Sequence, residues 1–352
     1  MESKANNPFN ITFGELPKNF IPKGTEVTQI TNAFNSEYPE SKVFVITGPR
    51  GSGKTVLLAH IKSLYDEKDN WLTVDLNPYG NIVEQLCAKI YDKGKLKRLF
   101  VKTEFNFSFK GFGFSISGER PISNADTLLE RMLSYLKKKQ IKVLVCIDDV
   151  VSNDNLKYFI HSYQYLISEH YDLFMLMSGL YDNIVEIEKD KGLTFFVRAP
   201  KIYVEKLSLI AIANSYMNLL GVDRETAIKL SKLTMGYAYG YQLLGNLLYR
   251  NDVKLTNELI AYFDSTLDIN VFALIWKSLT DKEKQILTII AEDNIENSKI
   301  LKEANLTNGA LQVYKTRLAK AGLIDTESRG KIKLTLPRFK EYILFKRDFA
   351  ED

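Results

Sequence analysis

The segment from Gly48 to Thr55 reads GPRGSGKT, and it limits the possible folds of this chain more tightly than any other segment. It matches the pattern G-x-x-x-x-G-K-[ST] at every fixed position. The apolar run Ser41–Thr47 leads into it, and the residues after it, up to Glu67, carry helical periodicity. A glycine-rich loop between a strand and a helix is typical of a phosphate-binding site, because backbone N–H groups and a helix N-terminus attract anions.

Each position of this loop has an expected role in binding a nucleoside triphosphate. Gly48 and Gly53 allow close approaches that a Cβ would obstruct. Lys54 would place its charge between the β- and γ-phosphates, and the Thr55 hydroxyl would ligate Mg²⁺. We therefore predict ATP with Mg²⁺ as the ligand and ADP as the product. The residues expected to contact the nucleotide here are Gly48, Pro49, Arg50, Gly51, Ser52, Gly53, Lys54, Thr55 and Val56.

A second acidic element follows farther along the chain. The run Lys142–Val150 (KVLVCIDDV) predicts a buried parallel strand that ends in Asp148 and Asp149. Two adjacent carboxylates repel each other unless a cation or solvent is near. Asp148 is thus the expected carboxylate that holds Mg²⁺ through water, and Asp149 is the candidate base for the attacking water. A solvated turn with two aspartates is the alternative.

Two more polar residues lie where the sheet is expected to end. Ser178 closes the predicted strand Leu173–Ser178, which would bring its hydroxyl near the γ-phosphate. A helix N-cap or a turn is the alternative for this serine. Arg198 precedes a predicted edge strand, and its guanidinium could reach a γ-phosphate in the same subunit or in a neighbour. A surface salt bridge is the alternative for Arg198.

The order of elements predicts three domains. Strands and helices alternate up to residue 205, with a further strand at Trp71–Leu76, which favours an α/β P-loop NTPase core with a mostly parallel sheet. Residues 206–270 predict a small all-α lid domain, and residues 271–352 predict a winged helix-turn-helix. The predicted helices are Asn81–Tyr91, Thr127–Lys139 with Asp126 as N-cap, Ser208–Leu220, Arg224–Thr234, Tyr237–Tyr249, Asp281–Ala291, Ser298–Ala304 and Thr307–Ala321, with a short hairpin at Asp325–Leu336.

An aromatic insertion near residues 101–118 stands apart from this pattern. Thr103–Ser117 alternates strictly between phenylalanines and polar residues, which predicts a β-hairpin with one apolar face. This face either packs on the core or binds a partner, and the sequence leaves both possibilities open.

The last predicted domain is rich in basic residues. From Glu296 to Arg347 there are 12 Lys/Arg against 5 Asp/Glu, whereas the whole chain carries +4. The third helix would bury Leu311, Tyr314, Leu318 and Ala321. Duplex DNA is the predicted partner, although winged helices also mediate protein contacts. The candidate DNA contacts are Asn308, Gln312, Lys315, Lys320, Arg329 and Lys331.

Composition narrows the remaining possibilities. Cys87 and Cys146 sit in apolar contexts and are expected to be buried thiols in a reducing cytoplasm. With only three histidines and no Cys/His cluster, we expect no structural zinc. The polar start, Met1–Asn10, predicts no secretory signal, and the apolar runs are too short to span a bilayer.

Together these residues carry a resemblance. GPRGSGKT, VCIDDV, the strand end MSG and Arg198, followed by helices and a winged helix, resemble AAA+ and STAND-type ATPases. The initiator-like (origin-recognition-like) branch and uncharacterised prokaryotic ATP-binding proteins look closest. The resemblance implies that the segment before the first core strand holds adenine, which makes Ile21 and Pro22 candidates for the base pocket. Related ATPases use glutamate where Asp149 stands, and the lid stretch Gly236–Gln242 contains no sensing arginine.

These departures from the family pattern imply slow hydrolysis and a STAND-like switch. The predicted function is therefore an ATP-binding and ATP-hydrolysing regulator whose nucleotide state controls assembly and DNA binding. The alternative is a nucleotide-dependent protein-interaction switch, as a homo-oligomer or with another protein, with little hydrolysis and no DNA binding. A small-molecule phosphotransferase is disfavoured because a terminal winged helix has no evident use there.

Overall fold

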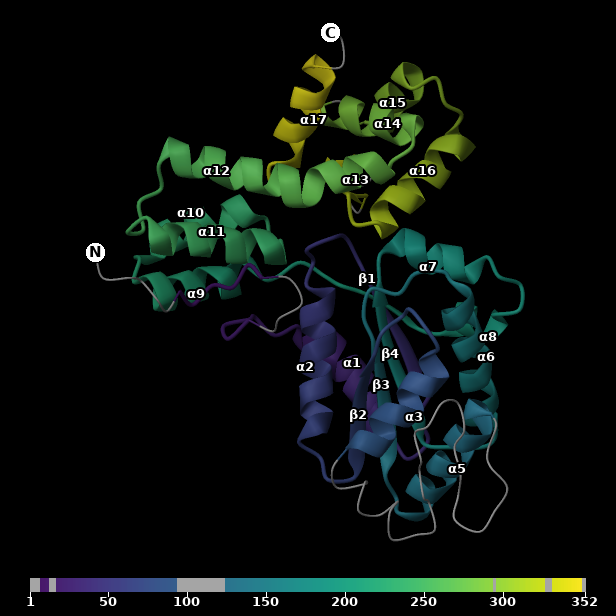
Figure 1. The fold of residues 1–352 in the computed structure, drawn as a ribbon. Coiled ribbons are helices and arrows are strands. Elements are labelled where there is room, and N and C mark those ends of the chain that lie inside the picture. The colour runs from purple at the N-terminus through teal and green to yellow at the C-terminus, as the bar shows by residue number, and fades with distance from the viewer. Residues whose placement is uncertain (1–6, 13–16, 94–123, 294–295, 327–330, 350–352) are drawn as a thin grey trace. The chain divides into compact units, whose positions relative to one another are not determined.

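The computed structural model describes residues 7–12, 17–93, 124–293, 296–326 and 331–349 (Figure 1). The described residues form two compact units. The sheet unit contains Gly24–Thr47 and Leu57–Ile202. The helical unit contains the residues up to Lys23, the loop Gly48–Val56 and the residues from Tyr203 onward. The aromatic insertion predicted at residues 103–117 lies outside the described residues.

A five-stranded sheet forms the centre of the sheet unit, in the order β2-β3-β4-β1-β5. Neighbouring pairs β2/β3, β3/β4 and β4/β1 are parallel, which confirms the predicted α/β fold with a mostly parallel sheet. The carboxyl ends of these strands therefore share one edge. The strands are β1 Val43–Thr47, β2 Trp71–Leu76, β3 Lys142–Ile147, β4 Leu173–Gly179 and β5 Lys201–Tyr203.

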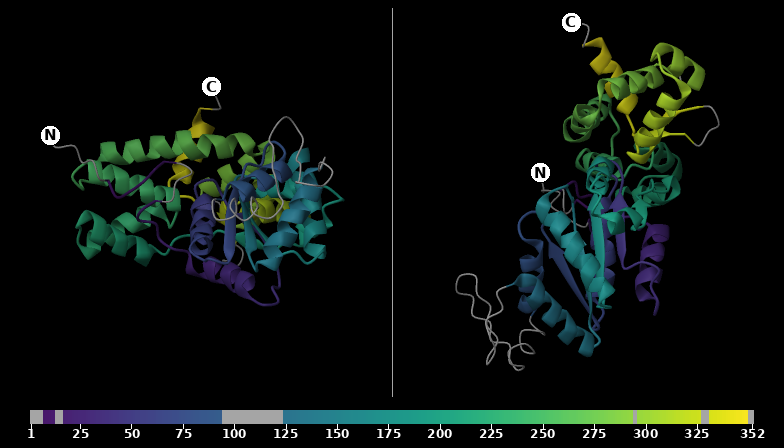
Figure 2. Two further views of the ribbon diagram at one scale, coloured as in Figure 1. Left: turned by 60° about the horizontal axis from the view of Figure 1, so that its bottom comes forward. Right: turned by 90° about the vertical axis from the view of Figure 1, so that its right-hand side faces the viewer.

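Helices cover both faces of this sheet, and the right-hand view of Figure 2 shows the strands between purple α1 and the helices of the opposite face. On one face α1 and α2 pack through an aromatic cluster, in which the Phe34 ring lies 5.1 Å from Phe174 and 5.5 Å from Phe44. The apolar sides of the other helices form the second face of the core. The helices are α1 Gly24–Asn35, α2 Lys54–Asp66, α3 Ile82–Asp92, α5 Ala125–Lys138, α6 Asp154–Ser168, α7 Tyr181–Glu188 and α8 Thr194–Arg198.

The helical unit is built almost entirely of helices around one continuous apolar core. A short antiparallel pair, β6 Ile324–Asp325 and β7 Lys333–Leu334, follows α16. The helices are α9 Leu209–Leu220, α10 Arg224–Thr234, α11 Ala238–Arg250, α12 Asn257–Leu267, the π-helix η1 Asp268–Phe272, α13 Ala273–Ser278, α14 Asp281–Ala291, α15 Asn297–Glu303, α16 Asn308–Lys320 and α17 Phe339–Asp348.

One continuous helical stretch, Asn257–Ser278, is long and apolar enough by composition to cross a membrane. Three of its apolar side chains, Leu259, Phe263 and Leu267, are buried in the core of the helical unit. Core helices of water-soluble folds pass the same length test, so this helix carries little weight as a membrane segment.

Two differences from the sequence predictions have simple physical causes. The N-cap of α5 is Asn124, whose side chain accepts from the Asp126 N–H at 2.9 Å, so the prediction of Asp126 as N-cap was wrong. The Asp126 carboxylate instead accepts from Tyr158 Oη at 2.5 Å and Ser162 Oγ at 2.7 Å, which holds α5 against α6. Helix α1 was not predicted, because only two of its three buried side chains, Ile30 and Phe34, are apolar, whereas the third is Glu26.

Candidate functional site

The glycine-rich loop joins β1 to α2, and its lysine is buried. Lys54 is the first residue of α2 and is only 7% exposed. Its Nζ donates to the carbonyl oxygens of Gly48 at 3.2 Å and Pro49 at 3.0 Å. Ser52 is also buried, and its Oγ has no hydrogen-bond partner among the described residues. A buried hydroxyl without a partner costs about 1–3 kcal/mol, so a phosphate oxygen that accepted its hydrogen would stabilise the loop.

The start of α11 contacts the outer side of this loop, within the helical unit. Tyr237 Oη donates to the Arg50 carbonyl at 2.6 Å, and the Tyr239 N–H donates to the Gly51 carbonyl at 3.0 Å. In a trans peptide the next N–H points away from the carbonyl. The two bonds therefore turn the N–H groups of Gly51 and Ser52 away from α11. Burial raises the pKa of Tyr237 well above its usual value, so its hydroxyl remains a donor.

Gly51 is the residue that permits this contact. It has φ +74°, and a Cβ at this position would lie 2.1 Å from Tyr237 Oη and 2.9 Å from Tyr239 Cβ. Neither the backbone conformation nor the space suits any residue with a side chain. The loop and α11 thus fit each other at a position that the sequence motif leaves variable.

The acidic residues lie at the carboxyl edge of the sheet, in the sheet unit. Asp148 directly follows β3, and Ser178 Oγ, fully buried in β4, donates a short hydrogen bond to Asp148 Oδ1. The Val150 N–H donates to the Ser178 carbonyl at 2.8 Å, which ties the ends of the two strands together. Ser178 therefore orients the Asp148 carboxylate. The N-cap of the following helix is Leu180, not Ser178.

Asp149 and Arg198 are both exposed. Asp149 has φ +51°, in the left-handed region that residues with a side chain rarely adopt. Arg198 ends α8, just before β5, which is the edge strand beside β1 as predicted. Among the residues that the structure describes, no carboxylate forms an ion pair with Arg198, so the surface salt bridge has no support there.

A cavity of about 590 Å³ opens beside the two aspartates. The connection between β2 and α3 forms one wall, which two amide side chains fix in place. Gln85 Nε2 donates to the Tyr79 carbonyl at 2.8 Å, and Asn153 Nδ2 donates to the Pro78 carbonyl at 3.0 Å. The cavity gives solvent access to Asp148 and Asp149, which a catalytic water and a hydrated metal ion both need.

The segment predicted to hold the base belongs to the helical unit, together with the loop and α11. Ile21 is half-buried against the core of this unit, whereas Pro22 is exposed. The sheet unit supplies Asp148, Asp149, Ser178 and Arg198. Thr55 and Val56 are half-buried at the start of α2.

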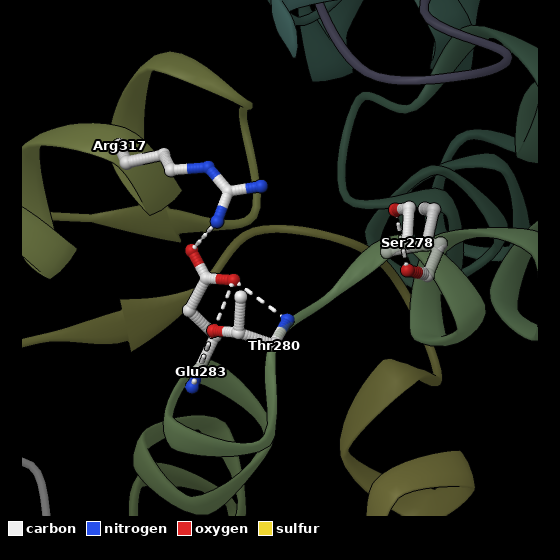
Figure 3. Close-up of polar contacts among 5 residues, drawn as sticks. Ser278, Thr280, Glu283 and Arg317 are labelled. Atoms are coloured by element: carbon white, nitrogen blue, oxygen red, sulfur yellow. Dashed lines mark hydrogen bonds and ion pairs between the residues drawn. The ribbon is translucent and has the colours of Figure 1, made fainter.

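The C-terminal part of the helical unit has the predicted order of three helices and a short hairpin, and an ion pair between a buried glutamate and a half-buried arginine joins two of these helices (Figure 3). Glu283 in α14 is fully buried, and its Oε2 accepts from the Thr280 N–H at 2.9 Å in a capping box. The other carboxylate oxygen pairs with Arg317 Nη1. Nearby, Ser278 Oγ donates to the Ile275 carbonyl at 2.7 Å and closes the end of α13. The orientation of α16 against α14 is thus fixed by a charge pair.

The outer face of α16 is less basic than its sequence suggests. Leu311 and Leu318 are buried and Tyr314 and Ala321 are half-buried, in agreement with the predicted apolar face. The predicted contacts divide by exposure. Lys315 is half-buried and donates to Asn297 Oδ1 at 3.2 Å. Arg329 lies outside the described residues. The remaining predicted contacts are exposed: Asn308, Gln312, Lys320 and Lys331.

Both cysteines are buried, as predicted. Burial raises the pKa of Cys87 to about 12 and that of Cys146 higher still, so neither thiol is reactive near neutral pH.

Comparison with known proteins identifies the architecture. Residues 20–189 match the model of an ATPase domain found predominantly in Archaea. The chain has a P-loop ATPase fold. Residues 269–343 match the model of a domain of unknown function. None of the curated proteins with which the chain was compared matches it.

Solved structures with this P-loop ATPase fold resemble nearly the whole chain. The Walker-type ATPase PABY2304 of Pyrococcus abyssi has a TM-score of 0.62 at 14% identity, over 92% of this chain and 96% of that one. The ORC2 protein of Aeropyrum pernix has 0.57 at 12% identity, over 97% and 98%. The Cdc6p protein of Pyrobaculum aerophilum has 0.50 at 14% identity, over 97% of each chain.

The sequence did not reveal the contacts of Tyr237, Tyr239 and Gln242 at and near the start of α11. They lie in the stretch that was noted only for lacking an arginine. The one available signal was a glycine, Gly236, followed by three tyrosines within five residues at the start of a helix.

Proposed function

We propose that this protein binds ATP with Mg²⁺ in the Gly48–Thr55 loop and hydrolyses it slowly. The buried Lys54 ammonium within a glycine-rich loop carries this proposal, because a phosphate chain is the ligand that such a site suits. The buried Ser52 hydroxyl also supports this proposal, because it has no hydrogen-bond partner among the described residues and a phosphate oxygen could accept its hydrogen. The structure of ORC2, which has a similar fold, was solved in complexes with ADPNP and ADP.

Each site residue then has a chemical role. Lys54 neutralises charge on the β- and γ-phosphates, and Thr55 and Asp148 would hold Mg²⁺. The metal ion, when bound, neutralises charge that develops on the phosphate oxygens. Ser178 keeps Asp148 oriented through its hydrogen bond. Asp149 accepts a proton from the attacking water, and the exposed Arg198 approaches the γ-phosphate, in the same or a neighbouring subunit.

Calorimetric titration with ATP and MgCl₂ tests the binding. Lys54→Ala removes a charge-assisted contact worth about 1.5–3 kcal/mol, so the Kd should rise by about 10- to 150-fold. Lys229→Ala is the matched control, because Lys229 is an exposed lysine whose ion pair with Glu225 lies on α10. Equal affinities of wild type and Lys54→Ala for ATP would refute the assignment of the loop.

Phosphate release tests the base. Asp149→Asn should retain ATP binding and lower the hydrolysis rate by about 10²–10⁴-fold, since general base catalysis contributes roughly that much. An unchanged rate in a variant with wild-type ATP affinity would exclude Asp149 as the base.

We further propose that the C-terminal part acts as a winged helix whose DNA binding depends on the nucleotide. A contact within the helical unit supports the coupling. The turn after α16 lies against the phosphate-binding loop, where a Cβ at Gly322 would be 2.5 Å from Pro49. A change in the loop on nucleotide binding would therefore reach the end of α16 directly.

Fluorescence anisotropy with a labelled duplex tests DNA binding, with and without ATP and MgCl₂. Each phosphate neutralised by Lys320 or Lys331 should contribute about −0.9 to the slope of log K against log salt concentration. The variant Lys320→Ala should weaken binding and reduce this slope by about one phosphate contact. Affinity that is absent, or independent of salt, would refute DNA binding.

One observation favours the second candidate, a nucleotide-dependent protein-interaction switch. The outer face of α16 exposes an apolar residue, Val313, at 68%, between Gln312 and the half-buried Lys315. Arg317 is committed to Glu283. A helix face with few available cations and an exposed valine suits a protein surface. Light scattering in ATP and ADP without DNA distinguishes the two: nucleotide-dependent assembly without DNA affinity favours the switch.

A further inference from the structure

Helix α11 carries two amide side chains in an otherwise apolar environment. Gln242 and Asn246 are one helical turn apart and only 8% and 4% exposed. Burying an amide without hydrogen bonds costs roughly 1–3 kcal/mol, so such residues persist where they have specific partners. Both side chains bond to the N-terminal segment of the chain, which belongs to the same helical unit, although Asn246 Oδ1 has no hydrogen-bond partner among the described residues.

Gln242 bonds to two separate stretches of that segment. Its Oε1 accepts from the Asn10 N–H at 3.0 Å, and its Nε2 donates to the Asn19 carbonyl at 3.2 Å. One side chain therefore uses both its acceptor and its donor to hold backbone groups that are nine positions apart in sequence.

Asn246 and Gly245 anchor the first of the two stretches. Asn246 Nδ2 donates to the Phe9 carbonyl at 2.9 Å. The Phe9 ring is 2% exposed, lies 5.7 Å from the Tyr241 ring, and would be 2.4 Å from a Cβ at Gly245. The segment near Phe9 is thus part of the core, and it gives Gln242 a fixed point from which to hold Asn19.

The second stretch leads directly into the segment that the sequence resemblance predicts to hold the base. Asn19 is two residues before Ile21, and Ile21 packs against the same core. We propose that Gln242 positions the base-binding segment Phe20–Pro22, so that the lid helix α11 determines how much the base contributes to nucleotide affinity. This inference rests on the proposed function. It identifies Gln242 as a positioning residue that does not itself contact the triphosphate.

The test compares two ligands that share a phosphate chain. Full-length wild type and Gln242→Met, which has a similar volume and no amide, are titrated with ATP and with inorganic tripolyphosphate, each with MgCl₂. We expect Gln242→Met to weaken ATP binding about five- to tenfold and to leave tripolyphosphate binding unchanged. Faster amide hydrogen exchange in residues 18–21, which lie between Pro17 and Pro22, should accompany the loss. A merely structural role would weaken both ligands alike.

Two further variants keep the result interpretable. Gln242→Glu retains the acceptor for the Asn10 N–H but places an oxygen beside the Asn19 carbonyl, and it should reproduce the selective loss. Gln285→Met is the matched control, since Gln285 Nε2 donates to the Glu303 carbonyl at 3.3 Å in the C-terminal part, and it should bind both ligands as wild type does.

The outcomes separate this inference from the proposed function. If wild type binds neither ligand, the proposed function fails. If wild type binds both ligands equally well, or if both Gln242 variants bind ATP as tightly as wild type, the inference is overturned and the assignment of the loop stands. An equal loss of affinity for both ligands also overturns it.

Discussion

The structure requires glycine at position 51, whereas the sequence motif allows any residue there. The motif fixes Gly48 and Gly53 but leaves this position variable, so Gly51→Ala would preserve the pattern in full. The structure nevertheless gives Gly51 a φ of +74° and places Tyr237 Oη 2.1 Å from where the new Cβ would be. We predict that Gly51→Ala disrupts the contact between the loop and α11.

The magnitude has two parts. An alanine in the left-handed region costs about 1–2 kcal/mol. Displacing Tyr237 also breaks its hydrogen bond to the Arg50 carbonyl and leaves the hydroxyl of the buried Tyr237 without its acceptor, which costs about 1–3 kcal/mol. Gly51→Ala should therefore lower the free energy of unfolding by about 2–5 kcal/mol.

Gly221 offers a control for the backbone part alone. It has φ +68°, close to that of Gly51, and nothing lies within 4 Å of its hypothetical Cβ. Gly221→Ala should cost only about 1–2 kcal/mol. The difference between the two alanine variants, about 1–3 kcal/mol, then measures the clash with Tyr237.

Urea unfolding followed by circular dichroism, with and without ATP and MgCl₂, provides the measurement. In a Tyr237→Phe background the bond to Arg50 is already absent, so adding Gly51→Ala should cost about 1–3 kcal/mol less than it does in wild type. Equal destabilisation by Gly51→Ala and Gly221→Ala would refute the reasoning, since it would mean that α11 does not contact the loop at this point.

Three other predictions follow from buried polar groups. Tyr237→Phe alone should weaken ATP and tripolyphosphate to the same extent, about five- to tenfold by calorimetry, because the bond to Arg50 orients loop amides; a loss confined to ATP would contradict this. Burial and the nearby carboxylate of Asp264 raise the pKa of Asp268 from 3.8 to about 6, so ionisation of Asp268 opposes folding. The free energy of unfolding should therefore fall as the pH rises from about 4 to about 6. Asp268→Asn should remove this component from the pH dependence of the urea midpoints. An unaltered pH profile would rule out that titration. Glu283→Ala should lower the free energy of unfolding by about 2–3 kcal/mol, because it removes a capping box and the partner of Arg317. A change below about 1 kcal/mol in urea unfolding would contradict a stabilising pair between Glu283 and Arg317.

The sheet was predictable because its strands are short apolar runs with clear ends. Trp71–Leu76 matches the predicted bounds, and the strand predicted at Leu173–Ser178 extends by one residue. The predicted strand Lys142–Val150 ends earlier, at Ile147, since the two aspartates leave the sheet. Periodicity failed for α1 and for the stretch from Asn257 to Ser278, where π-helical geometry in η1 shifts the apolar pattern.

Of the candidate site, the loop is the part that the sequence predicts most directly, because its residue types stand at a fixed spacing. The loop could be recognised because glycines, lysine and threonine stand at defined intervals. The contacts of Tyr237 and Gln242 could not, because each side chain donates to a backbone carbonyl that is distant in sequence, at Arg50 and Asn19. The residue type alone does not reveal whether a tyrosine or glutamine side chain is exposed or hydrogen-bonded to a backbone group that is distant in sequence.

Ion pairs neutralise part of the positive charge that the sequence places in the C-terminal part. Of the 12 cations between Glu296 and Arg347, four pair with carboxylates that precede that segment. The pairs are Arg317–Glu283, Arg338–Asp264, Lys340–Asp293 and Arg347–Glu292. A fragment cut just before Glu296 would separate these cations from their counter-charges and would adhere to any polyanion, heparin included. Retention of such a fragment on a nucleic-acid column would thus describe the excised piece and give a false picture of the intact chain.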